Sequence, residues 1–345
     1  MKTVDLFAGA GGLSIGLKQA GFEPVCAVEM DNDASRTYSR HSPKAKVYSD
    51  NIENVDLSNY SGVELVCGGP PCQPFSTGGL RAGKYDSRNM IPAFIDTVHL
   101  LNPKAFLIEN VPGLAVGKRR EYLNQILEKL ETLGYKVTWK VLNAADYGVP
   151  QSRRRLFIVG LKGIDFSFPN PTHGPNGQTP YITAGDVLTD QPYGTQNTSK
   201  ITYAKKPDLR PSPYHGLLFN GGGRPIDMSK PSPTILASAG GNKTHFVDVK
   251  GEVPRYHSYL NDGGTPRTGQ LNGARRLTPE ESALLQSFPK DLVFCGARSS
   301  QYRQIGNAVP PKLAEALGQE LFRHINLLSN EVYSSKTVTR QITLF

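Results

Sequence analysis

One cysteine in this chain is placed for nucleophilic chemistry. Cys72 follows Pro70 and Pro71 in the run 68–76, which comes directly after the apolar run 63–67, and that apolar run is typical of a buried strand. A Pro-Pro turn at the end of a buried strand would present the thiol rigidly at the mouth of a cleft. The thiolate is the nucleophilic form, so such a site must lower the thiol pKa or accept its proton. The alternative, an ordinary small hydrophobe in a turn, is disfavoured by the prolines on both sides.

A second group of residues has the types expected of a nucleoside site. Residues 5–13 read as a strand, a glycine-rich turn and a helix start, and Glu29 ends the next strand twenty residues after Gly9. An acidic residue in that position can accept hydrogen bonds from ribose hydroxyls. Asp50 closes the following strand in the same way. The alternative for Glu29 and Asp50 is a solvated carboxylate at a strand end.

The glycine spacing of this turn does not fit a dinucleotide. Gly9, Gly11 and Gly12 are followed only by Gly16, which departs from the usual fingerprint. Recognition of a nucleoside without a pyrophosphate fits better, and S-adenosylmethionine is such a ligand.

Strand and helix patterns alternate through the first 160 residues, which predicts a parallel sheet covered on both faces. The expected strands are 2–7, 24–29, 46–49, 63–67, 105–109, 135–142 and 156–160. The expected helices between them are 12–20, 34–41, 89–101 and 119–133. The fold class is therefore α/β, of the Rossmann-like methyltransferase type if the ligand is S-adenosylmethionine.

The amino-acid composition of the chain changes near residue 163. From there to about 270 it is rich in Pro, Gly, Thr, Ser and Asn, which predicts a smaller, loop-rich and mostly β domain. Helical patterns return at 277–288 and 311–328, and residues 334–345 read as a polar tail.

Composition narrows the classes of partner. The 345 residues carry a net charge of +9, for which nucleic acid is the commonest polyanionic partner. The four cysteines are scattered and form no CxxC pair, which fits reduced cytosolic thiols and disfavours a zinc site, so no metal is expected. No apolar run is long enough to span a bilayer, and the first residues begin a strand rather than a signal peptide. A cytoplasmic protein is expected.

Six motifs occur in the order found in the DNA (cytosine-5)-methyltransferases, and the chain closely resembles that family. They are 5–12 for the cofactor, 69–73 for the nucleophile, 109–111 for the acid, Gln-x-Arg-x-Arg at 151–155, and the two late motifs at 275–280 and 304–310. The stretch from about 165 to 270 matches in character only, and in this family it chooses the DNA sequence. The resemblance implies a catalytic domain at 1–163 plus 302–332, a target-recognition domain at 164–301 and a tail at 333–345.

The resemblance also implies a covalent mechanism. Cys72 would add to C6 of cytosine and make C5 nucleophilic, while Glu109 would hold a proton on N3. Arg153 and Arg155 would contact the ring carbonyl and the backbone of the flipped nucleotide. The base that removes the C5 proton is not identified.

The family motifs assign a larger set of residues to the cofactor and its product, S-adenosylhomocysteine. These are Phe7, Ala8, Gly9, Gly11, Gly12, Leu13, Glu29, Met30, Asp50, Asn51, Ile52, Gly69, Pro71, Asn307, Ala308 and Val309. At Met30, relatives often carry an aromatic residue.

Double-stranded DNA is the expected substrate, and a base in a duplex must be flipped out to be reached. The loop 73–89, with Ser76, Arg81, Lys84 and Arg88, is expected to close over that base. Thr234 and Ile235 resemble the family's Thr-Leu pair. The glycine-containing loops 220–224 and 240–243 would place Arg224, Asn242 and Lys243 toward a groove, although plain turn chemistry explains them equally well.

Other readings remain open at this point. Exocyclic-amine methyltransferases lack the cysteine, whereas a tRNA cytosine-5 methyltransferase would share every catalytic motif. A non-catalytic DNA-binding regulator is a further alternative. The compact length resembles that of bacterial or phage enzymes, which are usually partnered with a restriction endonuclease; that partner is functional rather than physical. A monomer is expected, because it suits an enzyme that reads one strand at a time.

The tail carries one more pattern. Gln341, Leu344 and Phe345 match the short Gln-x-x-Leu-Phe peptide by which bacterial proteins dock on the replication sliding clamp. The alternative is that this segment packs back on its own domain or matches by chance.

Overall fold

The computed structural model describes residues 1–72 and 89–342, and from residue 329 onward it describes only the backbone. A seven-stranded sheet organises the first part of the chain, with strand order β3-β2-β1-β4-β5-β7-β6. The first five strands in that order are parallel, and β7 pairs antiparallel with both β5 and β6. The strands are β1 Lys2–Leu6, β2 Glu23–Val28, β3 Lys46–Tyr48, β4 Leu65–Gly68, β5 Ala105–Asn110, β6 Tyr135–Asn143 and β7 Arg154–Lys162.

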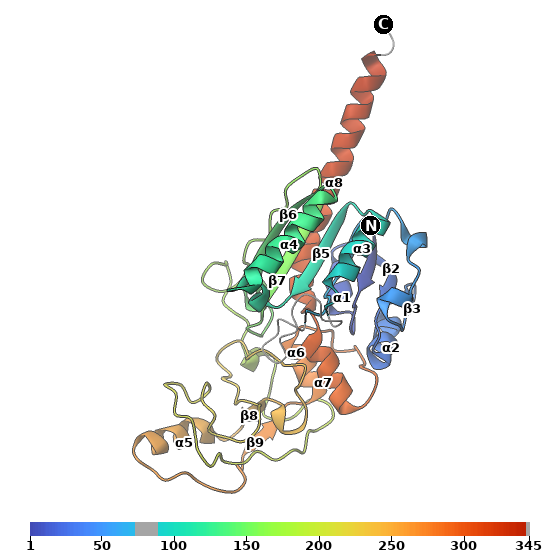
Figure 1. Cartoon of the computed structure of the whole chain (residues 1–345). Helices are drawn as coiled ribbons and strands as arrows, with labels where there is room; N and C mark the ends of the chain where they lie inside the picture. The colour runs from blue at the N-terminus through green and yellow to red at the C-terminus, as the bar shows by residue number, and fades with distance from the viewer. Residues whose placement is uncertain (73–88, 343–345) are drawn as a thin grey trace. The chain divides into compact units, whose positions relative to one another are not determined.

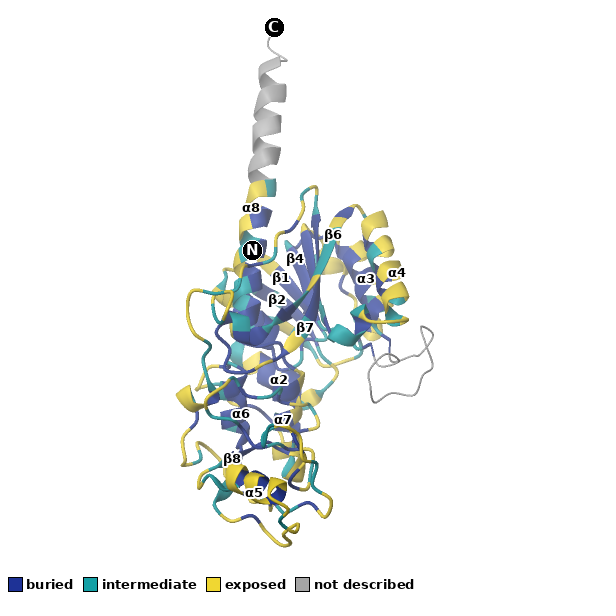
Figure 2. Cartoon of the chain, turned by 90° about the vertical axis from the view of Figure 1, so that its left-hand side faces the viewer, coloured by how far each residue is buried: buried dark blue, intermediate teal, exposed yellow. Residues whose placement is uncertain are grey.

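Helices cover this sheet on both sides, as a parallel sheet requires. Figure 2 shows α3 and α4 on one side of the sheet and α8 on the other. The helices are α1 Gly12–Gln19, α2 Asn32–His41, α3 Ile91–Leu101, α4 Arg119–Thr132 and α8 Pro311–Ile342. Local chemistry sets their starts: the Asp31 carboxylate accepts the backbone N–H groups of Asp33 and Ala34 at 3.0 and 3.1 Å, and so caps α2. The mostly parallel α/β fold predicted from the sequence is confirmed.

The core of this unit lies between the sheet and the helix pair α3 and α4. Strand residues such as Val66 and Phe106 cluster there with Phe94 of α3 and Leu123 of α4, all fully buried. The continuous apolar strands predicted this, because central strands of a parallel sheet are buried on both faces.

Close packing joins α1 to α8, although the two helices are far apart in the sequence (Figure 1). Gly16 faces the first turn of α8, and a Cβ atom at that position would lie 2.1 Å from the carbonyl oxygen of Pro311. The approach therefore depends on the missing side chain.

A second compact unit comprises 144–153 and 171–310. Its elements are α5 Glu252–Asn261, α6 Pro279–Leu285, α7 Arg298–Asn307 and a two-stranded sheet of β8 Phe246–Asp248 and β9 Ala274–Arg276, besides short 3-10 turns. The unit is loop-rich as expected, but β8 and β9 are the only named strands among its residues, so it is less β-rich than predicted. Its backbone groups bond through isolated bridges and side-chain caps, as when Thr278 and Glu281 form a capping box on α6.

The unit boundaries differ from the predicted domain bounds. Segments 144–153 and 302–310, predicted in the catalytic domain, belong to the second unit, whereas 164–170, predicted in the target-recognition domain, and 333–342, predicted as a tail, belong to the first. The side chains of Gln151 and Arg153 explain the first difference, because they bond to Gln286, Ile235 and Gly306 within the second unit. Helix α8 also continues beyond 328, to Ile342.

No helix among residues 1–72 and 89–342 is long and apolar enough to cross a membrane. The same residues contain no group of three His, Cys, Asp or Glu side chains that could hold a metal ion. The predicted DNA contacts Ser76, Arg81, Lys84 and Arg88 lie outside the described residues, as do Leu344 and Phe345 of the clamp-like peptide.

Candidate active site

The turn after β4 holds Cys72 in a fixed frame. The Pro71 carbonyl accepts the Met90 N–H at 3.0 Å, and Cys72 forms an antiparallel bridge with Asn89. Asn89 in turn donates from its amide nitrogen to the Tyr122 hydroxyl of α4 at 2.6 Å. The chain on both sides of 73–88 is therefore tied together at the cysteine.

The Cys72 side chain is only 7% exposed in this frame. Burial raises the pKa of its thiol to about 12, and the charge of Arg119 lowers that pKa by a smaller amount. Burial therefore favours the protonated thiol over the thiolate at neutral pH.

Glu109 and Arg155 form an ion pair beside this turn. Glu109 lies near the end of β5, next to β4 in the sheet, and Arg155 lies near the start of β7. The Arg155 Nε is 2.9 Å from Glu109 Oε1, and the two side chains are 17% and 12% exposed. Glu109 Oε2 packs against Gly69, and the Asn110 amide donates to the Pro70 carbonyl at 3.0 Å. Strand order thus brings Cys72, Glu109 and Arg155 to one edge of the sheet.

Arg153 is placed differently from its neighbour in the motif. It is 1% exposed, and its guanidinium donates to the carbonyl oxygens of Ile235 at 3.1 Å and Gly306 at 2.8 Å. These bonds hold the guanidinium to the backbone of the second unit. The contact of Arg153 with a nucleotide stays a prediction.

The glycine-rich turn lies between β1 and α1, at the carboxyl ends of the central strands. Phe7 has a φ of 55°, uncommon for a residue with a side chain. Glu29, directly after β2, holds this turn: its Oε2 accepts the Gly9 N–H at 2.8 Å and its Oε1 accepts the Asp31 N–H at 2.7 Å. Burial raises the pKa of Glu29, and these backbone bonds oppose the rise.

A buried polar network supports the glycine-rich turn, and the sequence did not predict it. The Ser14 hydroxyl donates to Asp5 Oδ2 at 2.6 Å and lies 2.7 Å from the Tyr38 hydroxyl, while His41 Nε2 lies 2.9 Å from the Ala10 carbonyl. Burial raises the pKa of Asp5 to about 7. The one sequence signal for this network was the spacing of Tyr38 and His41, because residues three apart lie on the same face of a helix.

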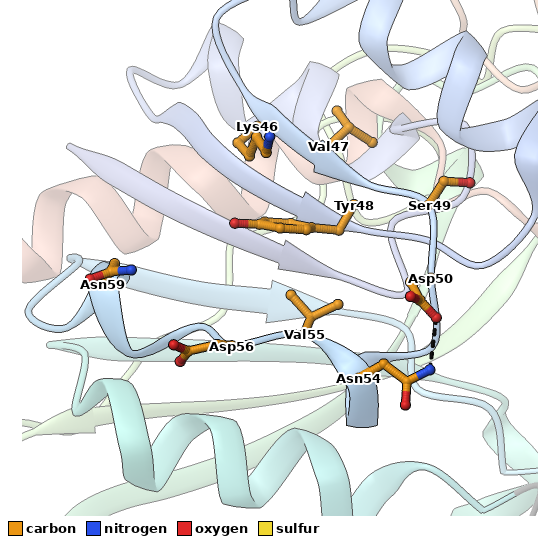
Figure 3. A pocket seen from close by; sticks show the side chains of 9 residues that line it. All are labelled: Lys46, Val47, Tyr48, Ser49, Asp50, Asn54, Val55, Asp56 and Asn59. Atoms are coloured by element: carbon orange, nitrogen blue, oxygen red, sulfur yellow. Dashed lines mark hydrogen bonds between the residues drawn. The ribbon is translucent and has the colours of Figure 1, made fainter.

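Asp50 lies beside an open pocket of about 500 Å³ along the edge strand β3 (Figure 3). Its Oδ1 accepts the Asn51 N–H at 2.6 Å and the Asn54 amide at 2.9 Å. Asp50 is the one predicted cofactor residue among the side chains lining this pocket. Of the other predicted cofactor residues in this unit, Met30 is 74% exposed and Ile52 is buried.

The predicted DNA-facing residues of the second unit divide by burial. Asn242 and Lys243 are exposed in a short 3-10 turn, and the Arg224 guanidinium donates to the His215 carbonyl at 2.9 Å. Ile235 is buried, and its N–H donates to Gln151 Oε1 at 3.1 Å. Ile235 therefore supports the unit from within.

The predicted cofactor segment of this unit is partly buried. Asn307 is exposed, whereas Ala308 and Val309 are buried.

Comparison with known proteins decides the family. The model of the C-5 cytosine-specific DNA methylases matches residues 1–323. The chain belongs to this family. The sequence-based prediction of the family is confirmed, as is the prediction that the protein is a methyltransferase enzyme.

Curated relatives of the family match most of the chain. The Type II methyltransferase M.AplI of Arthrospira platensis is 37% identical over 92% of this chain and 84% of its own length. The Type II methyltransferase M.NgoMIV of Neisseria gonorrhoeae is 33% identical over 93% and 97%.

Solved structures of this C-5 cytosine methylase's fold include two eukaryotic proteins. DNMT2 of Spodoptera frugiperda superposes with a TM-score of 0.70 at 21% identity, covering 93% of this chain and 99% of that one. The methyltransferase EhMeth of Entamoeba histolytica gives 0.67 at 16% identity, covering 94% and 98%. At these identities the likeness shows the fold alone.

Proposed function

We propose that this C-5 cytosine methylase transfers a methyl group from S-adenosylmethionine to C5 of a flipped-out cytosine in duplex DNA, as the modification enzyme of a restriction-modification system. The arrangement of Cys72 beside the Glu109–Arg155 ion pair, at the ends of adjacent strands, carries the proposal. The Type II names of the relatives support the biological setting.

The residues around the glycine-rich turn suit the cofactor. Glu29 already organises the turn through Gly9, and each carboxylate oxygen keeps lone-pair capacity for a ribose hydroxyl. Phe7, Glu29 and Asp50 follow β1, β2 and β3, three consecutive parallel strands of the sheet, and ligands of open α/β sheets bind at such strand ends. When bound, S-adenosylmethionine supplies the electrophilic methyl group.

The chain's own residues do the remaining chemistry. The Cys72 thiolate adds to C6 of cytosine, and the electron pair moves toward C5, which becomes the nucleophile. Glu109 holds a proton on N3, so the ring accepts the added electrons without building an anion. Arg155 holds Glu109 through the ion pair and offers its remaining N–H groups to O2. A base then removes the C5 proton, the released electron pair re-forms the C5–C6 double bond, and the bond from C6 to Cys72 breaks to return the thiolate.

Methylation of a mixed-sequence plasmid tests the function. Purified protein and S-adenosylmethionine should produce methylcytosine at one short recurring motif, read by bisulfite sequencing. Cys72→Ser should abolish it, because a hydroxyl is a far weaker nucleophile at neutral pH. Cys295→Ser, which changes another buried cysteine, serves as the matched control and should keep the same motif and yield.

Two outcomes would contradict the proposal. Full activity of Cys72→Ser would remove the covalent mechanism. No methylation of duplex DNA by folded, cofactor-binding protein would transfer the proposal to an RNA substrate or to a non-catalytic DNA binder, which the same assay with tRNA separates.

The wider setting follows from this function. We expect a monomer in the cytoplasm, with double-stranded DNA as its direct partner and a restriction endonuclease as a functional one. Docking of the segment ending in Leu344 and Phe345 on the sliding clamp stays a prediction, and no binding of that peptide to purified clamp at high micromolar concentration would remove it.

A further inference from the structure

Three segments that the sequence analysis treated separately meet in the second unit. Loop 220–224 runs beside 242–246: the Phe246 N–H donates to the Arg224 carbonyl at 3.1 Å, and the Ile226 N–H donates to the Phe246 carbonyl at 2.9 Å. A Cβ atom on Gly223 would lie 2.0 Å from the Thr244 carbonyl oxygen, so the two segments touch backbone to backbone. They form one piece rather than two independent loops.

The His245 side chain joins this piece to a third segment. It is 5% exposed; its Nδ1 accepts the Arg224 N–H at 2.9 Å, and its Nε2 lies 3.2 Å from the Thr234 carbonyl. An N–H only donates and a carbonyl only accepts, so Nδ1 is bare and Nε2 carries the hydrogen. Burial lowers the pKa of His245, with Arg224 and Arg276 as the nearby cations, which agrees with a neutral ring.

The partners of His245 are anchored in turn. The Thr234 hydroxyl donates to the Ser152 carbonyl at 2.8 Å, and Gln151 accepts the next N–H along the chain. On the other side, the Arg276 guanidinium donates to the Thr244 carbonyl at 2.6 Å. The imidazole therefore bridges two parts of the unit that are each held to its interior.

We propose that His245 is a positioning residue for DNA sequence recognition. It fixes the Arg224 loop and the Asn242–Lys243 turn to the Thr234 segment, so that side chains from both loops present one pattern to the groove. This inference rests on the proposed function. His245 itself is buried and touches no DNA; it acts through the loops.

Two amide variants separate its two bonds. The Oδ1 of His245→Asn can replace Nδ1 as acceptor for the Arg224 N–H, but loses the bond to Thr234. The Nε2 of His245→Gln can replace the donor to Thr234, but loses the bond to Arg224. His245→Phe keeps the ring and loses both bonds.

The experiment measures kcat and KM for duplexes carrying the methylated motif or a single mismatch in it. We expect His245→Phe to raise KM for the motif about tenfold or more and to lower discrimination by a similar factor, because buried polar groups lose partners. The amide variants should fall between it and the unchanged protein. The kcat on the motif should change little, since the methyl-transfer residues keep their places.

A second buried histidine of the same unit provides the matched control. His257 lies on α5, with Nε2 2.7 Å from the Arg210 carbonyl and Nδ1 3.2 Å from the Asn261 amide nitrogen. His257→Gln can keep the first bond but loses the second, so it should lower the Tm without altering discrimination. If His257→Gln and the His245 variants lose discrimination equally, or if the His245 variants keep it within about twofold, the inference is overturned. If His245→Phe does not fold, the amide variants decide alone. Absence of methylation by the unchanged protein overturns the proposed function, and the inference with it.

Discussion

The Cys72 thiol of this methylase combines a nucleophile's position with an unreactive protonation state. Burial raises its pKa to about 12, so little thiolate exists near neutral pH in the structure described. In the proposed reaction, activation would therefore come from groups that arrive with the substrate, or from a proton acceptor on the base itself.

We expect alkylation of Cys72 in the free protein to be slow and steeply dependent on pH. Below its pKa the thiolate fraction rises tenfold for each pH unit, so the rate should still be climbing at about pH 10. Iodoacetamide labelling followed by mass spectrometry of the Cys72 peptide measures this, with a short unstructured peptide of the same sequence as control. A rate that levels off near the ordinary cysteine pKa of about 8.5 would contradict the expectation.

At this scale the sequence predicted which residues lie at strand ends but not which partners they choose. Cys72 was predicted from the Pro-Pro turn that follows an apolar strand, and Glu109 from the resemblance to the family. The hydrogen-bond partners of Arg153 and His245 were not predicted, because Gly306 and Thr234 are brought to them by the packing of distant segments. An arginine in a basic run gives no sign that its side chain will be buried and will donate to backbone carbonyls.

Among the elements, the contact of α1 with α8 is sensitive to a single atom. The expected Cβ of Gly16→Ala lies 2.1 Å from the Pro311 carbonyl oxygen, so the helices must move apart. Overpacking of this kind costs about 1–3 kcal/mol.

Urea unfolding of Gly16→Ala should therefore show a lower midpoint than the unchanged protein. Gly222→Ala is the matched control, because its Cβ meets only the Lys243 side chain at 3.5 Å and should alter stability little. Equal midpoints for both variants would mean that α8 moves away from α1 without loss of stability.

Apart from the C-terminal end of α8, the elements of the first unit were predictable to within a few residues because periodicity and burial agree there. The second unit was not, because its Pro- and Gly-rich segments have no period and rely on long-range bonds. Helix α5, Glu252–Asn261, was missed for this reason. Its first turn is held by Asp248, whose two carboxylate oxygens accept the N–H groups of Glu252 and Val253.

At the scale of the whole molecule, the net charge of +9 predicts that binding of this family member to DNA without its motif depends on salt. Each neutralised phosphate releases counterions, so two such contacts already weaken binding about tenfold between roughly 50 and 200 mM salt. Fluorescence anisotropy with a motif-free duplex should show at least this loss. Affinity that does not change with salt would show that apolar and neutral contacts dominate.

The packing of α8 on α1 also constrains synthesis in the cell. Helix α1 begins at Gly12, but its partner begins only at Pro311, with 171–310 in a separate unit between them. On the ribosome, the face of α1 that packs on α8, with Gly16 and Leu17, must therefore wait for nearly the whole of this sequence to emerge. Prematurely terminated chains would lack that partner helix. Chaperones that hold exposed apolar helices should accordingly engage the nascent protein early and release it late.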